Sequence, residues 1–185
     1  MAGDIADPAS APQCLLMSAE VDAVLEREMI AAGPDDEHIG GIRIVDGKLV
    51  VSTDSRAPGT MISIWHTHPN GTPFSSFDVG GLFSYGYPWD VVRTSKSDTY
   101  VAALTTRSPR DRTLESIKAE IDALQEQWWG AGRLMSFEES QHWAIYAVTR
   151  KYDAVYYYAA PGSLELRLVT EAGPVPVPDP KGFPG

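Results

Sequence analysis

The segment from residue 66 to residue 78, with the sequence HTHPNGTPFSSFD, holds the residue types that bind a metal ion. His66 and His68 are two residues apart, so on a β-strand both imidazoles point to the same face. Pro69 ends such a strand, and the turn signal Asn70-Gly71 predicts that the chain folds back and brings Asp78 to the same place. Two imidazoles and one carboxylate are a known zinc ligand set that leaves a fourth position for water. The pattern therefore predicts one Zn²⁺ per chain.

The chemistry that such a site supports is hydrolysis. A zinc ion with an open position lowers the pKa of bound water from about 15.7 toward about 7, so hydroxide becomes available at neutral pH. The reaction then needs a base that takes the proton and returns it to a leaving amine. Ser75 stands three residues before Asp78, where its hydroxyl can turn toward a developing oxyanion.

These residues also match a family motif. The sequence resembles the JAMM group of MPN-fold metalloproteases, whose motif is an upstream glutamate, then His-Ser/Thr-His-Pro, then Ser-x-x-Asp. The matching positions are Glu37, the run HTHP at residues 66–69, Ser75 and Asp78. In that family the glutamate belongs to a Glu-x-x-Gly pattern, which the sequence EHIG at residues 37–40 fits. The resemblance covers residues 37–82 and implies that Glu37 is the general acid and base.

Two assignments within the motif have alternatives. Two aspartates precede Glu37, so a solvated acidic turn is the alternative to a catalytic role. Six residues separate His68 from Ser75, whereas family members usually have seven. Either the Asn70-Gly71 turn absorbs the difference, or Ser76 is the motif serine in place of Ser75.

The resemblance implies an activity and a substrate class. We expect a zinc-dependent peptidase or isopeptidase that acts on a ubiquitin-like protein, whose extended C-terminal tail lies in a groove as an added strand. The aromatic side chains Tyr85 and Tyr87 are expected to form a wall of that groove, with core packing as the alternative. Thr67 and Phe74, beside the metal ligands, are further candidates for contact with substrate. A hydrolase domain of a secreted effector and a catalytically inert MPN-like scaffold are the alternative functions.

The elements that position these residues follow from periodicity and turn signals. Ser18 can cap a helix, and Asp46-Gly47 favours a hairpin because both turn positions need positive φ. The sequence predicts helices over 18–32, 113–128 and 136–150, strands over 61–68 and 100–105, and hairpins over 40–51 and 154–169. This order favours an α+β fold over a doubly wound parallel sheet. The resemblance implies a MPN/JAMM-like, cytidine-deaminase-like fold, in which a central mixed β-sheet is flanked by helices.

Composition sets the remaining expectations. The chain has 185 residues, which suits one domain over 14–172 between flexible tails at 1–13 and 173–185. A net charge of -10 without a basic cluster argues against nucleic acid and anionic membranes as partners. No signal sequence or membrane span is recognisable, and the single cysteine, Cys14, excludes an internal disulfide, so a cytoplasmic location is expected. We expect Cys14 to be a small buried residue and His38 and His142 to be structural or exposed. The sequence does not indicate an oligomeric state.

Overall fold

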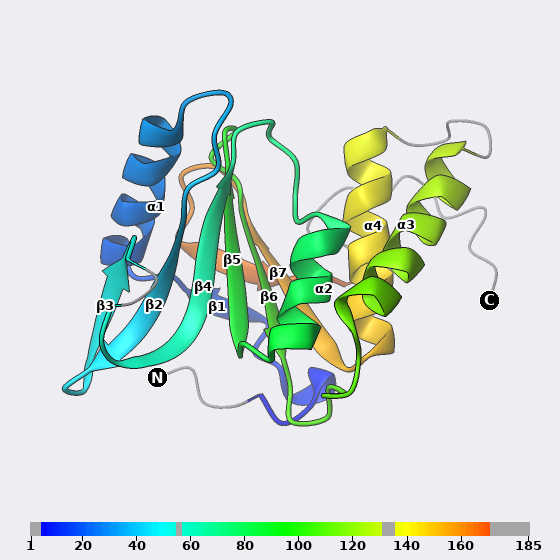
Figure 1. Cartoon of the computed structure of the whole chain (residues 1–185), viewed down its shortest axis with the longest axis horizontal. Coiled ribbons are helices and arrows are strands. Elements are labelled where there is room, and N and C mark those ends of the chain that lie inside the picture. Colours follow the sequence, from blue (N-terminus) through cyan, green and yellow to red (C-terminus); the bar gives the residue numbers. More distant parts are fainter. Residues whose placement is uncertain (1–4, 55–56, 131–135, 171–185) are drawn as a thin grey trace.

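The computed structural model describes residues 5–54, 57–130 and 136–170. Its centre is an eight-stranded sheet in the order β1-β8-β7-β6-β5-β4-β2-β3 (Figure 1). The strands are β1 (Cys14–Leu16), β2 (Ile39–Val45), β3 (Lys48–Ser52), β4 (Thr60–His68), β5 (Trp89–Thr94), β6 (Thr99–Leu104), β7 (Ala154–Ala159) and β8 (Glu165–Leu168). Strands β4 and β5 pair in parallel, and the other pairs of neighbours in this order are antiparallel. The sheet is therefore mixed.

Helices cover both faces of the sheet (Figure 1). Helix α1 (Ala19–Ala32) packs on β4 and β5, and on the other face α2 (Ser76–Tyr85) contacts β6 while α4 (Phe137–Lys151) contacts β7. Helix α3 (Leu114–Gly130) packs against α2 and α4. Buried side chains such as Leu25, Trp65 and Tyr157 fill the α1 side, and Phe83, Ile121 and Ile145 fill the other side. The strand carrying both histidines thus lies between two hydrophobic cores.

Local signals in the sequence explain why these elements begin and turn where they do. Ser18 caps α1 by accepting a hydrogen bond from the Val21 N–H, as expected. Asp46 and Gly47 both have positive φ and join β2 to β3, as expected for a tight hairpin. The predicted helices over 113–128 and 136–150 are confirmed as α3 and α4, and the predicted hairpin over 154–169 is confirmed as β7 and β8.

Three elements were not expected from the sequence. Helix α2 has the sequence SFDVGGLFSY, in which two glycines and a mostly apolar composition hide the helical period. Strand β5 is short and places the polar residues Asp90 and Arg93 inside the protein. Strand β1 has three residues and pairs with β8 at the edge of the sheet. In each case tertiary packing, rather than local propensity, decides the conformation.

The N-terminal region corrects two expectations. Residues 5–13 do not form a flexible tail, because Ile5 and Ala11 are buried in the α1-side core and the Thr106 N–H donates to the Ile5 carbonyl. A short 3-10 helix, Pro8–Ser10, begins after the capping residue Asp7. The expectation of a buried Cys14 is also wrong, since its side chain is exposed on β1. The C-terminal tail at 173–185 lies outside the described residues.

Among the residues that the structure describes, no helix has both the length and the apolar character that crossing a membrane requires.

Candidate metal centre

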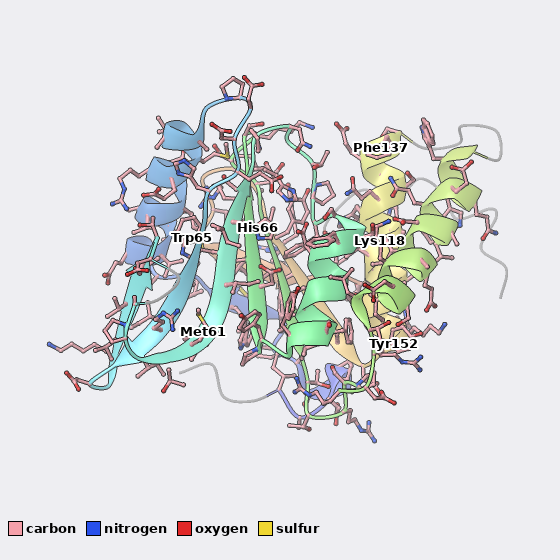
Figure 2. All side chains as sticks on the ribbon, in the orientation of Figure 1. Met61, Trp65, His66, Lys118, Phe137 and Tyr152 are labelled. Atoms are coloured by element: carbon pink, nitrogen blue, oxygen red, sulfur yellow. The ribbon has the colours of Figure 1, made fainter. Side chains whose placement is uncertain are left out.

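The two histidines of the sequence motif lie at the end of the central strand β4. His66 and His68 are both buried, and alternation along the strand directs both imidazoles to the α2 side of the sheet. Figure 2 shows His66 between the ribbons of β2 and α2. Strand β4 pairs with a neighbour on each edge. His66 is opposite Ile39 of β2 on one edge and opposite Val92 of β5 on the other. The ligand strand is therefore fixed by two ladders.

The loop after β4 returns the chain to the same place, as predicted. Gly71 has a φ of 73°, and its N–H donates to the His68 carbonyl. The Asn70 side-chain oxygen accepts hydrogen bonds from the N–H and the hydroxyl of Thr72. Helix α2 begins a few residues later and carries Asp78 in its first turn. The turn chemistry thus connects the histidines to the third predicted ligand.

The three predicted ligands converge on one point. The Nε2 atom of His66 lies 3.4 Å from Asp78 Oδ1, and the Nε2 atom of His68 lies 3.4 Å from Asp78 Oδ2. One ligand atom from each of the three residues lies within 4.8 Å of the others. Such spacing lets all three atoms reach a common cation, because zinc binds nitrogen and oxygen ligands at about 2.0–2.2 Å.

The hydrogen bond at the far side of the His68 ring sets its tautomer. The Nδ1 atom lies 2.8 Å from the Pro73 carbonyl and 3.1 Å from the Thr72 carbonyl. Since carbonyl oxygens only accept, Nδ1 carries the proton and donates it to them. The Nε2 atom then faces Asp78 and is the ring nitrogen that would bind a metal ion.

His66 has a carboxylate on its far side instead. Its Nδ1 atom lies 3.4 Å from Asp90 Oδ1, and Asp90, on the adjacent strand β5, is 1% exposed. Neither Asp90 oxygen has a hydrogen-bond partner, and neither does His66 Nε2. A buried carboxylate behind a histidine is a common support for a metal ligand. Of these atoms, His66 Nε2 faces Asp78 and fits a site that a cation would complete.

Asp90 is a functional candidate that the sequence reasoning missed. It stands as the second residue of the sequence WDVVRT, whose short apolar run was not interpreted as a strand. An acidic residue inside an apolar strand is costly to bury unless it is paired. A sequence analysis that recognised β5 as a strand would have found an acidic residue in a buried position. The cost of burying it would then have indicated that Asp90 has a functional partner.

The charges around His66 determine its protonation. Burial by itself lowers the pKa of His66, but Asp90 and Asp78 outweigh burial and raise the pKa of His66 to about 10. Burial likewise favours a raised pKa for Asp78, yet its contacts with His66 and His68 lower the pKa of Asp78 well below its ordinary value. The raised pKa means that the metal-free centre holds a proton on His66 at neutral pH, and a bound cation would take the place of that proton.

A pH dependence of the metal-free protein follows from this shift. The pKa of His66 is about 10 in the folded protein against 6.5 for the free side chain, so its stabilising effect is complete below about pH 6.5 and is lost as the pH rises toward 10. We expect the Tm measured in a chelating buffer to fall between about pH 7 and pH 10, and zinc to reduce this fall. The variant Asp90→Asn, which removes the carboxyl group facing His66, should show a weaker dependence. A Tm that rises over this range would contradict the prediction.

Glu37 lies at the edge of the same site, in the loop between α1 and β2. Its Oε1 atom is 3.8 Å from the Nε2 atom of His68, and its side chain is 57% exposed. The carboxylate thus borders the ligand cluster and is open to solvent. A general base needs this placement, because it must reach both the metal centre and an incoming substrate.

The predicted serine is Ser75, and its hydroxyl is hydrogen-bonded to the candidate ligand Asp78. The N–H and the hydroxyl of Ser75 donate to Asp78 Oδ2 at 2.6 and 2.7 Å, and the Asp78 N–H donates to Ser75 Oγ at 3.2 Å. This is the capping box of α2. Ser75 therefore orients Asp78, and its hydroxyl must rotate away from that carboxylate before it can face an oxyanion. Ser76 is the first residue of α2.

The two serines are expected to differ in their effect on stability. Ser75→Ala removes the helix cap and the hydroxyl bond to Asp78, and should lower the free energy of unfolding by about 1 kcal/mol. Ser76→Ala, at the next position, should change it by less than about 0.5 kcal/mol. Urea unfolding of both metal-free variants measures the difference. Equal destabilisation by the two substitutions would argue against the capping role of Ser75.

Two of the predicted substrate contacts are wrong. Thr67 is fully buried on the α1 side of the sheet, where its hydroxyl accepts a hydrogen bond from the His38 N–H. Phe74 is also fully buried, between the rings of His66 and Tyr156. Thr67 fails as a substrate contact because strand alternation turns it away from the metal face. Phe74 fails because it is part of the core.

The aromatic pair at the end of α2 lies away from the ligands. The rings of Tyr85 and Tyr87 are 6.1 Å apart, and Tyr85 is 65% exposed. Asp78 is in the first turn of α2 and Tyr85 is its last residue, which places them about 10 Å apart along the helix axis. The aromatic pair can contact a substrate only at a distance from the metal centre.

The other two histidines are structural, as expected. His142 is buried, with its Nδ1 atom 3.1 Å from the Tyr156 hydroxyl, and burial lowers its pKa to about 4. The Nδ1 atom of His38 lies 3.0 Å from Glu28 Oε2. Neither belongs to the ligand cluster found among the described residues.

The fold and the site together define a mixed α/β protein with a candidate centre of two histidines and one aspartate. Comparisons with models of protein families, with curated proteins and with solved structures found no match to this chain. The arguments for its function are therefore the geometry of the centre and the motif in its sequence.

Proposed function

We propose that this chain is a zinc-dependent hydrolase of the JAMM type that cuts an amide bond with the help of water. The observation that carries the proposal is the convergence of His66, His68 and Asp78 within 4.8 Å, with Glu37 at 3.8 Å from His68. The donor set suits zinc, and the carbonyls that bind His68 Nδ1 and the carboxylate behind His66 support this choice. A mixed sheet flanked by helices is compatible with the MPN-like fold that we propose.

Each residue has a part in the proposed reaction. Zinc, when bound to such a set, supplies a Lewis acid that polarises a carbonyl and lowers the pKa of water toward about 7. Glu37 accepts the proton of the attacking water and returns it to the leaving amine. Asp90 holds the His66 ring, and the Thr72 and Pro73 carbonyls hold the His68 ring. Ser75 holds the Asp78 carboxylate through the capping box of α2.

The substrate class that we propose is a ubiquitin-like protein or its conjugate, cut after an extended C-terminal tail. This choice is supported by the motif resemblance alone. We place the activity in the cytoplasm, because a single cysteine allows no internal disulfide.

The proposed function is tested with the purified full chain and a ubiquitin-like protein fused to a peptide. We expect cleavage at the end of the ubiquitin-like tail, loss of cleavage after treatment with a chelator, and recovery when zinc is added. Elemental analysis of the same sample should show one zinc ion per chain. A protein that binds no zinc, or that retains full activity in the chelator, would overturn the proposal.

A further inference from the structure

Glu37 has an exposed side chain in a loop, yet a general base must be held in one place. Residues 34–36 before it are exposed as well. The residue that follows Glu37, His38, is less exposed. Its contacts are where a restraint on Glu37 can be found.

His38 is bound on both of its main-chain groups by one residue. Its N–H donates to the Thr67 hydroxyl at 2.8 Å, and its carbonyl accepts from the Thr67 N–H at 2.9 Å. The first of these bonds fixes the peptide group that joins Glu37 to His38. Thr67 is the middle residue of the His-Thr-His run. Strand β4 therefore carries the two histidines on one face and binds His38, the residue next to Glu37, through Thr67 on the other face.

The His38 side chain has a second anchor on helix α1. Its Nδ1 atom lies 3.0 Å from Glu28 Oε2, and the other oxygen of Glu28 accepts hydrogen bonds from the Arg27 guanidinium. Glu28 is buried. His38 is thus held from β4 on one side and from α1 on the other.

Packing alone does not explain a threonine at position 67. The antiparallel pairing of β2 with β4 begins at Ile39 and His66 and continues along both strands. This pairing sets the register without the Thr67 hydroxyl. Valine has the same shape and an equal preference for strands, and it buries no polar group. A fully buried hydroxyl is costly unless it is hydrogen-bonded, and this one is used on the His38 N–H.

We propose that Thr67 and Glu28 are positioning residues, which act through His38 to hold the Glu37 carboxylate beside the metal centre. This inference rests on the proposed function, because it assigns these residues to the base of that reaction. Thr67→Val removes the acceptor of the His38 N–H without changing the shape of the side chain. The Glu37 carboxylate then moves more freely and spends less time near the cation.

The test uses zinc alone as the probe, so it needs no substrate. Glu37→Gln removes one negative charge next to the cation and should weaken zinc binding by about tenfold. Thr67→Val should weaken zinc binding by about three- to tenfold in the wild-type background, and by less than about twofold in the Glu37→Gln background. Thr67→Ser keeps the hydroxyl and should bind zinc as the wild type does. Competition with a chromogenic chelator measures all five affinities, including that of the double variant.

The outcomes separate this inference from the proposed function. A wild-type chain without zinc affinity would overturn both. An equal loss of affinity from Thr67→Val in the two backgrounds, or no loss in either, would overturn the positioning role and leave the metal centre intact. If Thr67→Val does not fold, Glu28→Ala is tested in its place. It too should weaken zinc binding in the wild-type background and have no such effect in the Glu37→Gln background. Hydrogen exchange at the His38 amide should become faster in Thr67→Val.

Discussion

A chain in which His66 and His68 are both replaced by alanine is expected to bind no zinc, whereas the wild type should bind one ion per chain. The double substitution removes both imidazoles and leaves only Asp78, whose Oδ2 atom is hydrogen-bonded to Ser75. A single carboxylate with this partner does not hold zinc in competition with water. The single variants His66→Ala, His68→Ala and Asp78→Ala should bind zinc weakly or not at all. Elemental analysis after gel filtration measures the zinc content.

A matched control comes from another buried histidine. His142 lies in α4 and contacts the Tyr156 hydroxyl, apart from the ligand cluster. His142→Gln should therefore retain one zinc ion per chain, even where it lowers stability. Zinc should also raise the Tm of the wild type, because it binds the folded state in preference to the unfolded chain, and this increase should be absent in the double variant. Full zinc occupancy in the double histidine variant would exclude the proposed centre.

The spacing of the metal ligands was predictable because it depends on local rules. Alternation along a strand places His66 and His68 on one face, and an Asn-Gly turn returns Asp78 to them. These relations hold within 13 residues and need no knowledge of the rest of the fold. The same holds for the cap of α1 and for the hairpin between β2 and β3, whose signals lie within a few residues of one another.

The supporting residues were not predictable, because they come from other elements. Asp90 faces His66 only after β5 has paired with β4, and that parallel pair has no turn signal in the sequence. Thr67 looked like a substrate contact because it lies between two ligands, but its role depends on His38, 29 residues away. Phe74 was assigned to the substrate for the same reason, and it is buried against Tyr156 instead. Proximity in the sequence brought together the three candidate ligands and misplaced their neighbours.

Replacing Glu37 with glutamine is expected to lower turnover by about 10²- to 10⁴-fold, which is the usual contribution of a general acid or base. Glutamine has the same shape and can still form hydrogen bonds, but it cannot take a proton from water or return one to the amine. The three ligands remain, so at saturating zinc the variant should contain one ion per chain. Parallel measurement of turnover and zinc content separates a loss of chemistry from a loss of metal.

The neighbouring acid provides the control for this prediction. Asp36 and Glu37 are adjacent and both exposed, but the carboxylate 3.8 Å from His68 belongs to Glu37. Asp36→Asn changes the net charge of the loop by the same amount and should keep turnover within about twofold of wild type. If both substitutions reduced turnover equally, the effect would come from the charge of an acidic loop. Only a loss specific to Glu37, with zinc retained, assigns the proton transfer to that carboxylate.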